Sequence, residues 1–355
     1  MLQRVTVPRG ARDIDFLRSF SKLERFSYDE DEGNAWRPTL TAAEFWREWD
    51  AAAAVTKALA KSGMAAKEIR GHSRGRCHVD LEQSGATDLS PLRGLPIASL
   101  RLGGNDVADL SPLRGMPLTE LLLYPTAVVD LKPLEGMPLE HLNLVSTGVV
   151  DLAPLRKMPL VYLRLARCNA LFDVSALKGM TTLKELTLPP GAVEVEFLRA
   201  LPNLERLSYN EDVVNGKLTM PPPEFWADLP RIRPLLKLRA QAMKQVGGDA
   251  DLEMEVKSSA HSDAGDVTLN SAPDSKNVEN VAVHLRADVA AAFKAKQSVE
   301  NLAEHYRGKR IRVSGKATLS NGSPVIAVDS ADQLTALDDV HRKLGTPVKG
   351  MGVTK

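Results

Sequence analysis

The sequence is poor in cysteine and aromatic residues and carries almost no net charge. Its 355 residues include two cysteines, 5% aromatic residues and a formal net charge of +1. So small a net charge gives no overall attraction to polyanions. No apolar run approaches the ~18 residues of a membrane-spanning helix, and the opening Met1-Leu-Gln-Arg4 lacks the apolar core of an export signal. These absences predict a cytoplasmic protein that does not span a membrane.

Motifs of the common enzyme classes are also missing. The seven histidines form no His-Glu-x-x-His pair and no Cys/His zinc spacing, and there is no G-x-x-x-x-G-K-[ST] phosphate loop. Asp249-Ala-Asp251 begins like a calcium loop but has no glycine at the sixth position. The glycine-rich loop, His-Arg-Asp and Asp-Phe-Gly set of protein kinases is absent. We therefore expect a protein that is not an enzyme and holds no metal or cofactor.

What the chain does contain is a segment that repeats about every 21 residues. Asp-Leu-x-Pro-Leu or a close variant starts at Asp88, Asp109, Asp130, Asp151 and Asp173, and Leu-x-x-Leu-x-Leu starts at Leu118, Leu139, Leu160 and Leu183. This is the leucine-rich-repeat pattern. The leucines are expected to point inward from a short parallel strand on a concave side. Proline lacks the amide donor of a helix, so a 3₁₀ turn or an extended segment is expected on the convex side.

A single repeat is not expected to be stable alone. Five buried leucines contribute about 1.5–3 kcal/mol each, whereas ordering 21 residues costs roughly 1.5 kcal/mol per residue. Stacking against neighbouring repeats closes the core and shares backbone hydrogen bonds. The sequence therefore predicts an α/β solenoid with a parallel sheet and a mostly non-helical convex side.

One position just after each strand is held by a small residue, in most repeats one that can form hydrogen bonds. These residues are Ser84, Asn105, Thr126, Thr147 and Cys168. We expect a polar ladder that satisfies backbone groups, which cost about 1–3 kcal/mol each if they are buried without a partner. Cys168 then has a structural role. Cys77 lies about four repeats away and should not pair with it, which favours a reducing environment.

The outward strand positions form a chemically varied concave surface. The candidate partner-binding residues are Arg101, Glu120, Tyr124, His141, Asn143, Tyr162 and Arg164. Tyrosine and arginine contribute interface energy more often than other residue types, so we expect a protein partner here. The alternative is an ordinary solvated sheet face.

The beginning of the chain resembles the end of the repeat array. Thr6-Val-Pro, Phe16-Leu-Arg, Leu23-Glu-Arg and Glu44-Phe-Trp match segments 181 or 180 residues later. Residues 1–40 are therefore interpreted as the closing repeat of a truncated first array. Thr41-x-x-Glu44 fits a capping box that opens a helix, and Phe-Trp in each copy is expected to cover the exposed core of its last repeat.

A different module follows Gly247-Gly248. Alternating segments predict strands at 252–256, 267–269 and 281–285, a helix at 288–296, and a hairpin of 311–319 with 325–328 around Asn321-Gly322. This order resembles an OB-fold barrel. Lys309, Arg310, Arg312 and Lys316 are the candidate nucleic-acid contacts. Single-strand binders also need aromatic stacking platforms, and these are missing from the predicted strands, so nucleic-acid binding remains the lesser alternative.

The expected domain boundaries follow from these patterns. A helical connector occupies 41–72, the solenoid 73–220, a helical linker 221–247, the OB-like module 248–340 and a flexible tail 341–355.

The repeats, best seen in Gly115-Met-Pro-Leu118 and Gly136-Met-Pro-Leu139, resemble leucine-rich-repeat proteins of planctomycete-like bacteria. They are similar to repeats attached to bacterial serine/threonine protein kinases, where they serve as interaction regions. The resemblance implies a binding role and carries over no catalytic residue. The hypotheses are a protein-binding scaffold, a nucleic-acid binder through the OB-like module, and the regulatory fragment of a larger signalling protein such as a kinase.

Overall fold

The structure is a computed structural model that describes residues 3–7, 13–27, 40–72, 75–209, 213–214, 217–218, 220–277 and 279–337. The chain divides into two compact units. The first holds residues 1–165, 175–186 and 198–204, and the second holds 166–174, 187–197 and 205–355. The division passes through the last repeats. The expected tail at 341–355 lies outside the described residues.

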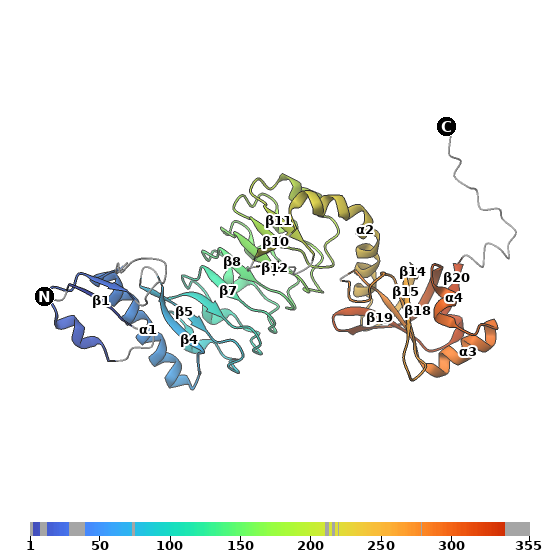
Figure 1. Ribbon diagram of the computed structural model, residues 1–355, viewed down its shortest axis with the longest axis horizontal. Coiled ribbons are helices and arrows are strands. Elements are labelled where there is room, and N and C mark those ends of the chain that lie inside the picture. The colour runs from blue at the N-terminus through green and yellow to red at the C-terminus, as the bar shows by residue number, and fades with distance from the viewer. Residues whose placement is uncertain are drawn as a thin grey trace. The chain divides into compact units, whose positions relative to one another are not determined.

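The chain opens with a small sheet and a long helix (Figure 1). Strand β1 (Arg4–Thr6) pairs in parallel with β2 (Arg25–Ser27), η1 (Asp15–Ser19) is a 3₁₀ helix between them, and β3 (Leu40–Thr41) leads into α1 (Ala42–Ser62). The expected capping box is confirmed, because the Glu44 amide donates to Thr41 Oγ1 at 3.2 Å and the Thr41 amide donates to Glu44 Oε2 at 2.8 Å. Phe45 is fully buried and stacks on Phe26 with ring centroids 4.3 Å apart.

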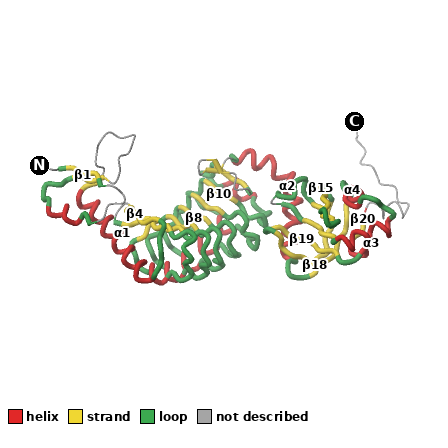
Figure 2. Tube along the Cα trace, turned by 60° about the horizontal axis from the view of Figure 1, so that its bottom comes forward, coloured by secondary structure: helices red, strands yellow, loops and turns green. Residues whose placement is uncertain are grey.

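The repeats form one sheet of eight strands in the order β11-β10-β9-β8-β7-β6-β5-β4. The strands are β4 (Glu68–His72), β5 (Arg76–Asp80), β6 (Ile97–Arg101), β7 (Glu120–Leu122), β8 (His141–Asn143), β9 (Tyr162–Arg164), β10 (Glu185–Thr187) and β11 (Arg206–Ser208). Pairing is parallel from β5 to β9, and β4 closes the start as an antiparallel hairpin with β5. The leucine-rich-repeat solenoid is confirmed, with strands along one face and loops along the other (Figure 2).

Each convex connection contains a 3₁₀ turn, as the prolines predict. The turns are η2 (Ser90–Leu92), η3 (Ser111–Leu113), η4 (Lys132–Leu134), η5 (Ala153–Leu155), η6 (Ser175–Leu177) and η7 (Glu196–Ala200). Proline occupies the first turn of η2 to η5, where its missing amide has no helical partner. The repeated aspartate opens each turn, since Asp109 Oδ1 accepts from the Ser111 amide at 2.8 Å and Asp88, Asp130 and Asp151 do the same.

The polar ladder lies inside the coil turns as predicted. Asn105 is 4% exposed, and its Oδ1 accepts from the Gly85 and Ala86 amides while its Nδ2 donates to the Leu81 and Leu102 carbonyls. Thr126 and Thr147 each donate to the carbonyl three residues earlier, at 2.7 Å. Cys168 is buried and in no disulfide. Backbone groups that the short strands leave unpaired are satisfied in this way.

A second closing element ends the array. After β11 come the hairpin β12 (Val213–Val214) and β13 (Lys217–Leu218) and then α2 (Pro222–Lys244). Phe225 is 2% exposed and packs on Tyr209 with ring centroids 5.4 Å apart. The elements β10, η7 and β11 begin 181 residues after β1, η1 and β2. The sequence match between the two ends of the array is therefore also a match of secondary structure.

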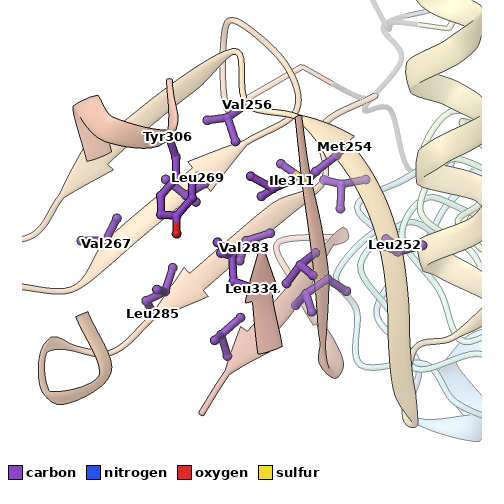
Figure 3. Packing of buried hydrophobic residues seen from close by; sticks show 14 of the residues in the cluster. Leu252, Met254, Val256, Val267, Leu269, Val283, Leu285, Tyr306, Ile311 and Leu334 are labelled. Atoms are coloured by element: carbon purple, nitrogen blue, oxygen red, sulfur yellow. The ribbon is translucent and has the colours of Figure 1, made fainter. Parts of the chain in front are cut away.

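The C-terminal module contains a seven-stranded sheet and two helices. Its strands are β14 (Asp249–Glu255), β15 (Ser258–His261), β16 (Val267–Asn270), β17 (Ala282–Leu285), β18 (Arg310–Ser320), β19 (Ser323–Val328) and β20 (Leu334–Ala336), its helices α3 (Ala287–Gln297) and α4 (Leu302–Tyr306), and η8 (Ala331–Gln333) is a 3₁₀ turn. Leu269, Val283, Tyr306, Ile311 and Leu334 point into one buried core (Figure 3). The predicted strands, helix and Asn-Gly hairpin are all found, whereas β15, α4 and β20 were not predicted.

The sheet order of this module is β14-β18-β19-β17-β16-β15, with β20 beside β18. The pair β17–β19 is parallel and the others are antiparallel. Strands β14 and β15 lie at opposite ends of this order, and no pairing between them closes the sheet among the residues that the structure describes. The closed OB-like barrel therefore stays a prediction.

Candidate functional site

The candidate site is the concave surface of strands β6 to β9, all within the first unit. The parallel register places Glu120, His141 and Tyr162 in one row across the strands, and Arg101, Leu122, Asn143 and Arg164 in the next. Between the rows, Leu100, Leu121, Leu142 and Leu163 point into the core and are at most 1% exposed. Alternation along each short strand thus sends one leucine inward for every two side chains that face outward.

At the start of this surface, three side chains from successive strands form a hydrogen-bonded chain. Ser99 Oγ donates to Glu120 Oε2 at 3.0 Å and lies 2.7 Å from His78 Nδ1. The serine proton points to the carboxylate, so the Nδ1–H tautomer of His78 donates to Ser99. Burial, aided by Arg70 and Arg101, lowers the pKa of His78 and keeps the ring neutral. These hydrogen bonds were not predicted from the sequence, although His78, Ser99 and Glu120 are spaced 21 residues apart.

The hydrogen-bonded chain does not form a nucleophilic site. Ser99 is 2% and His78 is 3% exposed, so a substrate cannot reach either oxygen or ring. The hydrogen bonds from His78 through Ser99 instead fix the Glu120 side chain at the surface.

The middle of the surface is aromatic. His141 and Tyr162 have ring centroids 4.4 Å apart at a tilt of 55°, and His141 is exposed while Tyr162 is half-buried. Tyr124 follows β7 and is 38% exposed. Asn143 is half-buried, and its Oδ1 accepts from the Val145 amide at 3.0 Å, which fixes the side-chain amide. These four residues from adjacent coils form a patch with apolar rings and polar atoms.

Two arginines border the patch in different states. Arg164 is 9% exposed and its Nη2 lies 3.2 Å from Glu185 Oε2, so its charge is neutralised by a buried partner. Arg101 is partly exposed, and no ion pair of its guanidinium occurs within the described part of the chain. The structure therefore brings all seven predicted residues onto one surface but gives a free positive charge only to Arg101.

The basic residues predicted on the C-terminal module lie in a charge ladder. Three ion pairs lie on the exposed face of β14 and β18. Arg310 Nη2 lies 3.4 Å from Glu253 Oε2, Arg312 Nη2 lies 2.6 Å from Asp251 Oδ2, and Lys316 Nζ lies 3.0 Å from Asp249 Oδ1. Lys309 lies near His305, with the two nitrogens 3.2 Å apart. Acidic residues at alternate positions of β14 thus neutralise the cations that would contact phosphates.

Other sites that the sequence leaves open have little support. Cys77 is buried, and burial raises the pKa of its thiol to about 12, which keeps it protonated. In the described ranges, no three His, Cys, Asp or Glu side chains cluster as metal ligands would. Among those residues, too, no helix has the length and apolar character that a membrane span requires.

Comparison with known proteins gives partial structural likeness only. No protein-family model matches the chain, and no curated protein matches it. An internalin, InlF, from Listeria monocytogenes has a similar structure with a TM-score of 0.29 and 22% identity, covering 36% of this chain and 45% of the internalin. Internalin C2 from the same organism has a TM-score of 0.27 and 25% identity, covering 36% of this chain and 68% of its own. The chain thus spans less than half of the first of these structures.

Proposed function

We propose that this chain is a non-catalytic, cytoplasmic protein-binding scaffold that holds its partner on the concave surface of β6 to β9. The observation that supports it most is the row of outward side chains on a continuous parallel sheet, where an exposed aromatic patch lies beside an unpaired arginine. Leucine-rich repeats form a rigid ribbon, so a partner meets side chains that are already positioned and loses little by ordering them.

Individual contacts follow from the geometry. Tyr124, His141 and Tyr162 supply apolar rings with polar tips, which suit a partner segment that is itself partly apolar. Arg101 offers a guanidinium fork to a carboxylate of the partner. On the next strand, Ser99 holds the Glu120 carboxylate in place, and this carboxylate accepts a hydrogen bond from a donor of the partner. Asn143 is held by the Val145 amide. Arg164 contributes shape rather than charge.

The test is site-specific photocrosslinking. A benzophenone amino acid at Tyr124 is expected to capture a discrete partner in extracts of the source cell, because this side chain is exposed beside the aromatic patch. The matched control is Glu135, exposed on the convex side of the same coil. Charge reversal at Arg101 should weaken the capture at Tyr124. Equal capture from both positions, or capture unaffected by Arg101→Glu, would contradict the proposal.

The C-terminal module is proposed to be an OB-like barrel that provides a second protein contact. Strands β14 and β15 stand at the ends of the sheet order but are joined by only Val256 and Lys257. Val256 donates to Lys309 beside β18, and Lys257 donates to Asn270 of β16, so consecutive residues reach both ends of the sheet. A strand bent at this point would close the barrel.

Nucleic-acid binding by this module is disfavoured by its charge ladder. Binding through phosphate contacts should fall steeply with salt, but Arg310, Arg312 and Lys316 already have carboxylate partners. A fluorescence titration with a labelled single strand at low salt is expected to remain flat. Saturable binding that is lost in Arg312→Ala would favour the nucleic-acid alternative instead.

A further inference from the structure

A hollow of about 600 Å³ lies on the convex side of the first unit, away from the proposed partner surface. It is lined by the turn after η5, residues 156–159, and by η6 with the turn that follows it, residues 175–176 and 178–182. Its cause is visible in the sequence. Where earlier repeats continue Met-Pro-Leu, this coil continues Met180-Thr-Thr-Leu183, with one residue more. We attribute the hollow to this longer turn, because both it and the Met158-Pro159 turn of the preceding coil line the space.

The lining of the hollow is positively charged. Arg156, Lys157 and Lys178 contribute three cations, and no carboxylate residue is among the lining residues. Thr181 adds a hydroxyl group, whereas the Thr182 hydroxyl already donates to the Leu160 carbonyl at 2.7 Å. Lys178 and Ser175 also interact with neighbouring groups, whereas Arg156 and Lys157 are both exposed at the hollow and are the main candidates for contact with a ligand. Glu135, which matches Arg156 one coil earlier, is not among the lining residues.

Lys157 adopts a backbone conformation that the other coils give to glycine. Its φ is +66°, in the left-handed region. At the same position of other coils the chain has Gly94, Gly115, Gly136 and Gly179, with φ between +70° and +77°. Glycine adopts this conformation without strain, whereas a side chain with a Cβ does so at a cost in free energy. One coil of five therefore accepts strain to place a lysine at the edge of the hollow.

We propose that this hollow binds a phosphate monoester of a small molecule. A dianionic phosphate matches a cluster of cations that has no carboxylate among its lining residues. The volume exceeds that of a phosphate group alone, so the space beside Met158 and Met180 receives the organic part of the ester. Such a ligand would bridge two coils on the convex side and stiffen the array there.

The test is calorimetric titration of the whole chain, at low ionic strength, with O-phosphoserine and with inorganic phosphate. Saturable binding is expected for both, with phosphoserine tighter if the ester part is also bound. Lys157→Gly introduces the residue that four other coils have at this position. It is expected to raise the urea midpoint by relieving strain while weakening phosphoserine at least about fivefold, since a charge-assisted contact is lost.

Further variants separate the site from general charge. Arg156→Ala should weaken binding to a similar extent. Arg114→Ala removes the matching arginine two coils earlier, outside the hollow, and should leave binding unchanged. The proposal is overturned if neither probe saturates at low millimolar concentration, or if Lys157→Gly, folded and stable, binds as tightly as the parent chain.

Discussion

At the scale of single residues, the buried polar side chains decide the local structure of the coils. Asn105 is the clearest case, because its side chain makes four hydrogen bonds to backbone groups of two coils. Small polar residues at one repeat position predicted this role from sequence. Their partners could not be predicted, since which amide reaches which oxygen depends on how two coils stack.

Asn105→Ala is expected to lower the free energy of unfolding by roughly 3 kcal/mol, because it leaves several buried backbone groups unpaired. Urea unfolding followed by circular dichroism measures the loss. Ser84→Ala provides the control, since the Ser84 hydroxyl is partly exposed and makes one long contact of 3.4 Å, and it should change little. A similar loss in both variants would contradict this role for Asn105.

Glu48 on α1 predicts a dependence of stability on pH. It is 6% exposed, and burial, with the neighbouring Glu44 carboxylate, raises its pKa to about 7 from 4.5. Between these values the folded chain keeps a proton that the unfolded chain has lost. Stability should therefore fall as pH rises from about 4.5 to 7, by up to roughly 3 kcal/mol.

Glu48→Gln should flatten this part of the stability profile and make the protein more stable than the parent at pH 8. Urea midpoints at several pH values for both proteins provide the measurement. Parallel profiles would show that Glu48 is ionised in the folded protein. The sequence alone gave no sign of this carboxyl group, because burial on a helix face depends on what packs against it.

At the scale of elements, the segment from β1 to α1 and the segment from β10 to α2 have equivalent positions in different surroundings. Leu201 on the second copy is 7% exposed, while Phe20, 181 residues earlier, is 45% exposed. Leu186 and Val5 differ in the same direction, since Leu186 is fully buried and Val5 is not. Equivalent positions thus have different surroundings, because β10 follows another coil and β1 is an edge strand among the described residues.

Leu201→Ser is expected to cost about 2–5 kcal/mol through loss of core packing, whereas Phe20→Ser should stay within about 0.5 kcal/mol. Denaturant unfolding of both variants tests this. A large loss for Phe20→Ser would mean that its ring is covered in solution, which analytical ultracentrifugation of the parent protein would detect as self-association.

Elements were predictable wherever a period or a turn signal was strong. The 21-residue repeat gave the strands and 3₁₀ turns of the solenoid, and Asn321-Gly322 gave the hairpin of β18 and β19. Strand β15 was missed because Ser258-Ser-Ala-His261 is polar and has no alternating apolar residues. The charge ladder of β14 with β18 required the strand register, which two distant segments do not reveal by themselves.

At the scale of the whole molecule, stability comes from the stacking of coils rather than from any one coil. Leu121 and Leu142 occupy the same place in successive strands, and each coil contacts mainly its neighbours. The concave surface could therefore be predicted as a row of residues 21 apart. The buried pair of Arg164 with Glu185 could not, because the repeat leucines Leu160 and Leu183 are 23 residues apart here. Two residues 21 apart therefore occupy different positions of β9 and β10.

Deleting residues 118–138 should leave a shorter folded array, because Leu139 then takes the place of Leu118 in the same register. Cooperative unfolding is expected to persist with a smaller m-value, since less surface is exposed. Deletion of 118–127, about half a coil, is the control and should abolish cooperative unfolding. If both deletions unfold alike, coils of this array are not interchangeable units.

The closing helix α2 sets how such an array can change in length. Phe225 packs on Tyr209 against the last coil, so a coil added after that point would have no leucine surface to join. Gain or loss of repeats during evolution must then occur upstream of α2, by insertion or deletion of whole coils. The Thr181-Thr182 coil, one residue longer in its turn than the Met-Pro-Leu coils, departs from this regular length and lines the hollow.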